Sequence, residues 1–353
     1  MQKLRVCVIG TGSISDMHLQ SYVKNPDVIL HGVYDYSKER AQEKAMKYGA
    51  SRVYNSLEEV FQDPEVDAVS ICTWNNSHAE ISIGALRGGK HVLVEKPLSM
   101  NVEEALRVEE AVRESNKNLQ VGFVRRFATN TKVLKSFIDT GKLGEIYYAK
   151  ASCLRRLGNP GGWFADIERS GGGPLIDLGV HIIDICWYLM GRPKVKSISG
   201  NTYHKLGNRG NVENLSFYKA ADYDKEQNTV EDMANALITF ENGASLLVDV
   251  SFTLHAKKDE IQVKLFGTKG GAELEPELVL VSEENNTMIN IHPQVDHTTF
   301  DFTNAFQGEI DAFVESCLSG TKPVAPVEDG VEIMKILAGI YEASEKKSVV
   351  TFS

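Results

Sequence analysis

The sequence predicts a two-domain α/β protein, in which a Rossmann domain with a doubly wound parallel sheet precedes an α+β domain with a large, mostly antiparallel open sheet. The chain has 353 residues, and domains commonly contain roughly 100–200 residues. Strand-like and helix-like segments alternate as far as residue 124, and strand-like segments dominate after residue 127. We therefore place the domains at residues 1–124 and 125–353.

The first domain carries the repeating strand–helix pattern of a parallel sheet. Its strand candidates are short runs rich in Val, Ile and Leu, which suits strands that are buried on both faces. Helical segments connect them, and such connections place helices on both faces of the sheet. The predicted strands are 4–9, 28–34, 68–72, 91–94 and 119–123, and the predicted helices are 14–24, 38–48, 78–87 and 102–115.

The second domain has the pattern of an antiparallel sheet with a few helices. Residues 241–243 and 268–271 are typical of hairpin turns, and hairpins join antiparallel strands. The polar stretch 203–228 predicts a long surface loop. The predicted strands are 145–154, 195–202, 230–240, 244–252 and 260–267, and the predicted helices are 131–140, 174–190, 302–319 and 331–346.

The composition excludes several classes of protein. With a formal net charge of −10, the chain is expected to repel nucleic acid and anionic membranes. Its apolar runs are shorter than a membrane span, and the run after the first residues is too short for a signal peptide. The five cysteines form no CxxC pair, which indicates reduced thiols and a cytoplasmic protein.

A glycine-containing turn follows the first predicted strand and opens the first predicted helix. Its sequence is Gly10-Thr11-Gly12-Ser13-Ile14. Gly10 permits a tight turn, and Gly12 lets the backbone approach a pyrophosphate that binds the amides of Ser13 and Ile14 at the helix N-terminus. The third small position of this motif is Ser15 instead of glycine, and a plain strand–helix turn is the alternative. The flanking strand and helix favour a dinucleotide site.

Asp35 ends the second predicted strand, about 20 residues after the glycines. An acid at this point hydrogen-bonds the ribose hydroxyls of a bound dinucleotide and repels the 2′-phosphate of NADP. The alternative is a cap on the next helix, for which Ser37 is better placed. We therefore expect NAD as the cofactor. Because Lys38 and Arg40 lie close enough to soften the repulsion, NADP is left open as an alternative.

Two more strand ends lie at the same edge of the predicted sheet, where such folds bind ligands. The third strand is followed by Thr73-Trp74-Asn75-Asn76-Ser77-His78, and we expect Thr73, Trp74, Asn75 and His78 to contact the cofactor. Asn75 is equally suited to cap the next helix, and a histidine in a first helical turn, as at His78, is often structural.

The fourth predicted strand is followed by Glu95-Lys96-Pro97. Lys96 suits general acid–base work on an alcohol or carbonyl, because partial burial and a positive nicotinamide would lower its pKa. Glu95 is expected to hold a ribose hydroxyl. The alternative is a surface salt bridge ahead of a turn.

The helix predicted after Pro174 carries a polar stripe among apolar residues and glycines. Asp177, His181 and Asp184 are spaced i, i+4 and i+7, so they share one face, and buried polar groups need partners. Three interpretations remain open at this point. Asp177 and His181 bind and orient a substrate hydroxyl, or the stripe ligates a metal, or all three groups are structural.

These blocks together resemble the Gfo/Idh/MocA family, named after glucose–fructose oxidoreductase, inositol dehydrogenase and a rhizopine-catabolism protein. The resemblance follows the family's order and spans essentially the whole chain. Trp74 stands where the family usually has proline, and Ser15 stands where it has the third glycine. The matching pieces are Gly10-Thr-Gly12 with His18, Thr73-x-Asn75-x-x-His78, Glu95-Lys96-Pro97, residues 122–127 with Arg125 and Arg126, and residues 171–184.

The resemblance implies that residues 1–124 bind the dinucleotide and that residues 125–353 bind substrate. It also implies a homodimer or homotetramer formed through the open sheet of the second domain. It names Lys96, Asp177 and His181 as the catalytic set, without a metal. It places Glu95 and Lys96 against the nicotinamide ribose and Arg125 at the edge of the cofactor and substrate site.

We therefore expect an NAD(P)-dependent dehydrogenase or reductase acting on the CH–OH group of a sugar, sugar derivative or inositol-like polyol. Besides Lys96, Arg125, Asp177 and His181, Trp163 is expected to bind substrate, since an indole face suits a sugar ring. The alternatives are a non-catalytic dinucleotide-binding sensor and a glycosidase that uses NAD transiently. The presence of the lysine and histidine favours hydride transfer, with specificity expected from residues 155–169 and 203–228.

Overall fold

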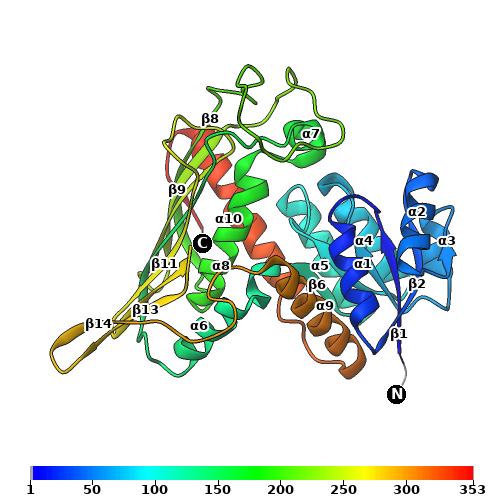
Figure 1. Ribbon diagram of the computed structural model, residues 1–353, viewed down its shortest axis with the longest axis horizontal. Helices are drawn as coiled ribbons and strands as arrows, with labels where there is room; N and C mark the ends of the chain where they lie inside the picture. Colours follow the sequence, from blue (N-terminus) through cyan, green and yellow to red (C-terminus); the bar gives the residue numbers. More distant parts are fainter. Residues whose placement is uncertain (1–2, 353) are drawn as a thin grey trace. The chain divides into compact units, whose positions relative to one another are not determined.

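The computed structural model describes residues 3–352, and the chain divides into two compact units (Figure 1). The first unit holds the residues up to Val124 together with Phe302–Met334, and the second holds Arg125–Asp301 together with the residues from Lys335 onward. Within the described part of the chain, none of the helices has the length and hydropathy that a membrane crossing requires.

The first unit is built on a six-stranded parallel sheet with the strand order β3-β2-β1-β4-β5-β6. The order reverses between β1 and β4, which is the point where doubly wound sheets bind dinucleotides. The strands are β1 (Leu4–Ile9), β2 (Val28–Tyr34), β3 (Arg52–Val53), β4 (Ala68–Ile71), β5 (His91–Glu95) and β6 (Leu119–Gly122). The helices are α1 (Ser15–Lys24), α2 (Lys38–Tyr48), α3 (Leu57–Gln62), α4 (His78–Arg87), α5 (Val102–Ser115) and α9 (Phe302–Ser319).

The core of this unit includes a helix from the far end of the chain. Leu4 and Val8 of β1 pack in one buried cluster with Leu19 of α1 and with Ile310 and Phe313 of α9. Burying each such side chain contributes about 1.5–3 kcal/mol. The first 124 residues therefore do not complete their own core, and α9 supplies part of it.

The second unit is built on a nine-stranded sheet with the order β14-β13-β12-β11-β7-β10-β9-β8-β15. Neighbouring strands pair antiparallel except β7 and β10, which run parallel. The strands are β7 (Ile146–Leu154), β8 (Val195–Tyr203), β9 (Met233–Phe240), β10 (Ser245–Ser251), β11 (Glu260–Gly267), β12 (Gly270–Glu275), β13 (Val279–Glu284), β14 (Thr287–Ile291) and β15 (Val350–Thr351). The predicted fold class is confirmed, as are both predicted hairpins.

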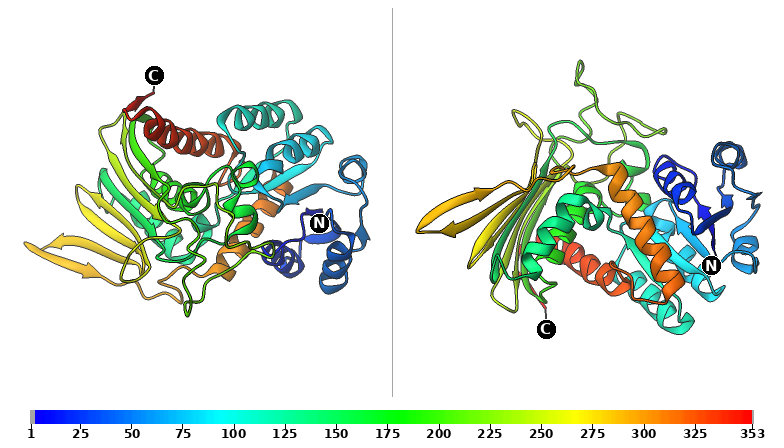
Figure 2. Two further views of the ribbon diagram at one scale, coloured as in Figure 1. Left: turned by 90° about the horizontal axis from the view of Figure 1, so that it is seen from above. Right: turned by 60° about the horizontal axis from the view of Figure 1, so that its bottom comes forward.

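The helices of the second unit lie against one face of this sheet (Figures 1 and 2). They are α6 (Thr129–Asp139), α8 (Val180–Leu189) and the C-terminal part of α10 (Val327–Lys346), with the short α7 (Ile167–Ser170) in a loop. Side chains of β9 and β10 alternate between buried and half-exposed positions. That alternation is expected when one face of a sheet is packed and the other is open.

Candidate active site

The glycine turn after β1 has the geometry that a dinucleotide needs. Gly10 has φ +89°, and a Cβ there would lie 2.8 Å from the carbonyl carbon of Cys72. A Cβ at Gly12 would meet nothing within 4 Å, so the space beside the turn is open to a pyrophosphate. Ser15 is buried, and its hydroxyl donates to the carbonyl of Gly12 over 2.6 Å. The turn therefore fits NAD, and serine fills the third small position without opening a gap.

Asp35 fixes this turn through its carboxylate. Its carboxylate accepts the backbone N–H of Thr11 (2.7 Å), the backbone N–H of Ser37 (2.8 Å) and a guanidinium N–H of Arg40 (2.8 Å). Burial alone would raise the pKa of Asp35, but the hydrogen bonds from Arg40 and the two amides outweigh it and lower that pKa. Ser37 is the N-cap of α2, as its side chain accepts the N–H of Arg40. Asp35 therefore does not serve as that cap.

His78 joins the two loops that follow β4 and β5. Its Nδ1 lies 2.7 Å from the carbonyl oxygen of Pro97, and its Nε2 lies 3.1 Å from the carbonyl oxygen of Thr73. Burial lowers the pKa of this imidazole. Trp74 is exposed, whereas Asn75 is buried at the start of a short 3₁₀ turn. The histidine thus fixes the loop that carries the three other predicted cofactor contacts.

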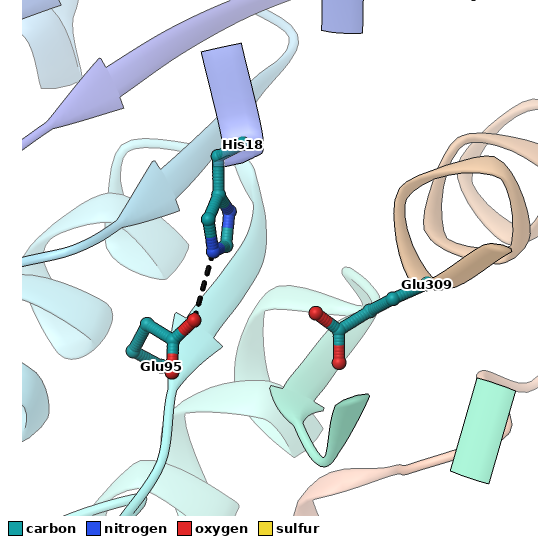
Figure 3. A group of neighbouring side chains, drawn as sticks. All are labelled: His18, Glu95 and Glu309. Atoms are coloured by element: carbon teal, nitrogen blue, oxygen red, sulfur yellow. Dashed lines mark hydrogen bonds and ion pairs between the residues drawn. The ribbon is translucent and has the colours of Figure 1, made fainter. Parts of the chain in front are cut away.

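A buried acid–base cluster of His18, Glu95 and Glu309 lies at the end of β5 (Figure 3). His18 Nε2 lies 2.8 Å from Glu95 Oε1, and His18 Nδ1 lies 2.8 Å from Ser70 Oγ. Burial opposes the charged imidazole, but Cys72 and Glu95 outweigh it and raise the pKa of His18 well above its usual range. Burial likewise opposes the Glu95 carboxylate, and His18 outweighs it and lowers that pKa. The two side chains form a buried ion pair that orients Glu95.

Glu309 of α9 is the third member of this cluster, and its carboxylate is directed toward the other two side chains in Figure 3. One ligand atom from each of His18, Glu95 and Glu309 lies within 4.8 Å of the other two. Such a set has donors that could hold a metal, but an ion would have to replace the bond between His18 and Glu95. Glu95 also accepts the backbone N–H of Lys96 over 3.2 Å. The cluster therefore supports the segment that carries the predicted general acid–base.

The second unit presents Asp177 and His181 on a helix that is otherwise buried. After Pro174 the chain forms a π-helical turn, Leu175–Gly179, and then α8. Along residues 172–187, all of which the structure describes, Asp177 and His181 alone are partly exposed. Single π-turns within α-helices occur often at functional sites.

Asp184, the third member of the stripe, has a structural role. It is fully buried, and its carboxylate accepts two N–H groups of the buried Arg126, with Nη2 2.6 Å from Oδ1 and Nε 3.1 Å from Oδ2. The members of the stripe thus differ in their surroundings. Two positions are accessible to a ligand, and one is an internal ion pair.

Arg125 belongs to the same unit as Asp177. Its guanidinium bonds Glu275 over 2.7 Å and lies 4.5 Å from the ring centre of Phe300. Burial raises the pKa of the Cys153 thiol on β7, while the charge of Arg125 lowers it and that of Asp177 raises it. The charges of Arg125 and Asp177 therefore both act on the Cys153 thiol.

The two loops expected to set specificity pack against each other in the second unit. Trp163 is half-exposed beside Phe164. Arg169 bonds Asp222 over 3.0 Å, and a Cβ at Gly161 would lie 2.3 Å from the ring of Tyr223. The glycine thus lets the loop of Tyr223 approach the loop of Trp163.

The predicted site residues divide between the two units. The first contains Gly10, Gly12, Ser13, Ile14, Asp35, Thr73, Trp74, Asn75, His78, Glu95 and Lys96, and the second contains Arg125, Trp163, Asp177 and His181. Sequence reasoning missed Glu309, and it also missed Glu231 and Tyr341, which contact the start of the Asp177 helix. Glu309 and Tyr341 lie on helices late in the chain, where no local pattern connects them to the site. The only available signal was an acid, Glu231, in a predicted strand.

Comparison with known proteins identifies the family of this chain. Residues 4–123 match the model of an oxidoreductase family with an NAD-binding Rossmann fold, and residues 135–352 match the model of that family's C-terminal alpha/beta domain. The chain belongs to the Gfo/Idh/MocA family of oxidoreductases, which confirms the predicted family, the oxidoreductase class and the NAD cofactor.

Individual relatives cover nearly the whole chain. D-glucoside 3-dehydrogenase of Escherichia coli (strain K12) is 33% identical over 97% of this chain and 95% of its own length. The NAD⁺-dependent scyllo-inositol 2-dehydrogenase of Bacillus subtilis (strain 168) is 31% identical over 91% and 88%. A levoglucosan dehydrogenase solved with NADH and levoglucosan superposes with a TM-score of 0.87 at 22% identity, covering 99% of both chains. This last comparison shows a shared fold.

Proposed function

We propose that this oxidoreductase transfers a hydride between NAD and a secondary alcohol or ketone of a sugar, a sugar derivative or an inositol-like polyol. Lys96 is the general acid–base, and Asp177 and His181 bind and orient the reacting hydroxyl. The names of the relatives support the substrate class, because they act on glucosides and inositols. NADP is a second cofactor to be tested alongside NAD.

The chemistry assigned to each side chain follows from its donors and acceptors. In the oxidation direction, Lys96 accepts the hydroxyl proton at Nζ as the carbon gives up its hydrogen with both bonding electrons. NAD supplies the acceptor for that hydride. Asp177 accepts a hydrogen bond from the substrate, and His181 donates or accepts one. In the reduction direction, Lys96 returns the proton to the forming alkoxide.

The observation that carries the proposal is the exposure pattern of residues 172–187, where the described side chains are buried apart from Asp177 and His181. A polar pair left accessible on an apolar helix suits a polar ligand. Arg125 offers a further charged donor in the same unit, and Trp163 offers an aromatic face for a ring with CH patches. We include both as substrate contacts.

The remaining cofactor contacts and the assembly belong to the same proposal. Residues 1–124 form the dinucleotide-binding domain, with Gly10, Gly12, Ser13, Ile14, Asp35, Thr73, Trp74, Asn75, His78, Glu95, Lys96 and Arg125 as cofactor contacts. Residues 125–353 bind substrate and form a homodimer or homotetramer through the open face of the large sheet, where Leu237 and Phe266 are exposed. The five cysteines are unpaired, which supports a cytoplasmic enzyme, and the reaction assigns no role to a metal.

The test is a screen of glucosides, inositols, anhydrosugars and free sugars with NAD⁺ and NADP⁺, following reduced cofactor by absorbance. Simple apolar alcohols and amino acids form the comparison set. Turnover of at least one polyhydroxylated compound, lost in Lys96→Ala, is the expected result. Activity confined to the comparison set would refute the substrate class. Tight NADH binding without turnover of any compound would favour a dinucleotide-binding sensor.

A further inference from the structure

The helix that presents Asp177 and His181 begins against a buried carboxylate from another part of the chain. Glu231 is buried and lies two residues before the start of the strand β9. Its Oε2 accepts the backbone N–H of Gly173 over 2.9 Å, and its Oε1 accepts the backbone N–H of Leu175 over 3.1 Å. Pro174, between them, has no N–H to satisfy. One side chain thus takes both amide donors at the first turn of the helix.

A second buried group fixes the carboxylate from the other side. The hydroxyl of Tyr341, on α10, donates to Glu231 Oε1 over 2.9 Å. Burial and the negative charge of Glu231 raise the pKa of Tyr341 well above its usual range. The phenol is therefore a protonated donor at neutral pH.

The glycines before the helix are explained by the same contact. A Cβ at Gly172 would lie 2.1 Å from the hydroxyl oxygen of Tyr341, and a Cβ at Gly173 would lie 2.4 Å from the backbone carbonyl oxygen of Glu231. The side chains are absent so that the turn can approach both partners. The sequence Gly171-Gly172-Gly173-Pro174 is therefore shaped around Glu231 and Tyr341.

We propose that Glu231, held by Tyr341, is a positioning residue for the catalytic helix. It fixes the first turn, and with it the direction of Asp177 and His181, which lie one and two turns further along. A carboxylate is suited to this place, because it satisfies amides that a helix leaves unbonded and complements the positive end of the helix dipole. This inference rests on the proposed catalytic role of Asp177 and His181.

The test compares Glu231→Ala, Glu231→Gln and Tyr341→Phe, using the most active compound from the substrate screen. Alanine removes both amide contacts, glutamine retains one acceptor oxygen, and phenylalanine removes only the supporting donor. We expect kcat to fall by about 10–100-fold in the alanine variant, less in the glutamine variant and least in Tyr341→Phe. NADH affinity, measured by fluorescence titration, should remain native in all three.

The control is Tyr54→Phe, since Tyr54 is another buried tyrosine whose hydroxyl donates to a carboxylate, Asp63, over 2.8 Å in the first unit. It should lose stability with native kcat. If all the Glu231 and Tyr341 variants lower only the melting temperature and keep native kcat, the positioning role is wrong. Should Glu231→Ala not fold, the graded loss of kcat in the glutamine and phenylalanine variants decides the question.

Asp177→Asn, made in the same series, separates this inference from the proposed function. An inactive Asp177→Asn beside Glu231 and Tyr341 variants that all keep native kcat would overturn the positioning role alone. A fully active Asp177→Asn would overturn the catalytic assignment, and the positioning role with it.

Discussion

Replacing Asp35 with serine should change the cofactor preference of the enzyme in two ways: NADP should bind more tightly, and NAD should bind more weakly. The carboxylate now bonds Thr11, Ser37 and Arg40. Without it, the 2′-phosphate of NADP no longer meets a negative charge, and Arg40 becomes free to attract that phosphate. At roughly 4 Å in a water-like medium each unit charge pair is worth about 1 kcal/mol.

Removing the repulsion from a group of charge near −2 contributes about 2 kcal/mol, and the attraction of the same group to Arg40 contributes about 2 kcal/mol more. NADP should therefore bind about 4 kcal/mol more tightly, which is roughly a thousandfold. NAD itself should bind about tenfold more weakly or worse, because charged hydrogen bonds of about 1.5–3 kcal/mol are lost. The glycine turn also loses the acceptor for Thr11.

The assay is kcat/KM for NAD⁺ and NADP⁺, with NADH and NADPH dissociation constants from fluorescence. Asp35→Ser combined with Arg40→Ala is the matched control, and it should lose the part of the gain that depends on Arg40. A ratio of NADP to NAD that does not move in Asp35→Ser would show that Asp35 serves only to hold the turn.

Three further predictions concern turnover, stability and pH. Lys96→Ala should lower kcat about a hundredfold or more in a protein that remains folded by circular dichroism; native turnover would exclude the proton-transfer role. Asp184→Ala leaves the Arg126 guanidinium buried without its carboxylate and should cost about 3–5 kcal/mol of unfolding free energy in urea titrations, whereas Asp184→Leu with Arg126→Met should recover much of it. Burial, and then the charge of Lys117, lowers the pKa of His91 to about 4. The unfolded chain, with a histidine pKa of about 6.5, therefore binds an extra proton between those values, and stability falls as the pH falls through that window. His91→Gln should flatten the decline, and an unchanged slope would contradict the low pKa.

The long helices and strands of this fold could be predicted from the sequence, because the alternation of apolar and polar residues within each segment shows which face is buried. β2, α2, α4, α5 and α9 have the predicted bounds. The structure also contains β3, with two residues, and α3, with six, which the sequence did not predict. Both are too short to show a period of 2 or 3.6 residues. The predicted helix 174–190 begins with a π-turn, and hydrophobic periodicity does not distinguish that geometry.

Candidate site residues could be proposed from the sequence where they directly follow a predicted parallel strand. Gly10, Asp35, Asn75 and Lys96 all come just after a parallel strand, and such ends share one edge of the sheet. The partners of these groups were not predictable. Asp35 holds Thr11, and no spacing rule distinguishes that role from ribose binding.

The partners of the buried acids could not be predicted from this sequence. A carboxylate taken out of water costs several kcal/mol unless charge or hydrogen bonds compensate it. Three buried acids of this chain meet this condition through partners that are distant in the sequence. Glu95 bonds His18, Asp184 bonds Arg126, and Glu231 bonds two amides and a tyrosine hydroxyl.

An acid within an apolar strand or helix therefore indicates that a compensating partner exists. The identity of that partner is known only from the three-dimensional structure. Tyr341 is separated from Glu231 by 110 positions, and His18 is separated from Glu95 by 77. The local sequence around each acid is compatible with many partners. For this reason the reacting residues of the enzyme can be proposed from short motifs, whereas the residues that hold them in place follow only from the three-dimensional structure.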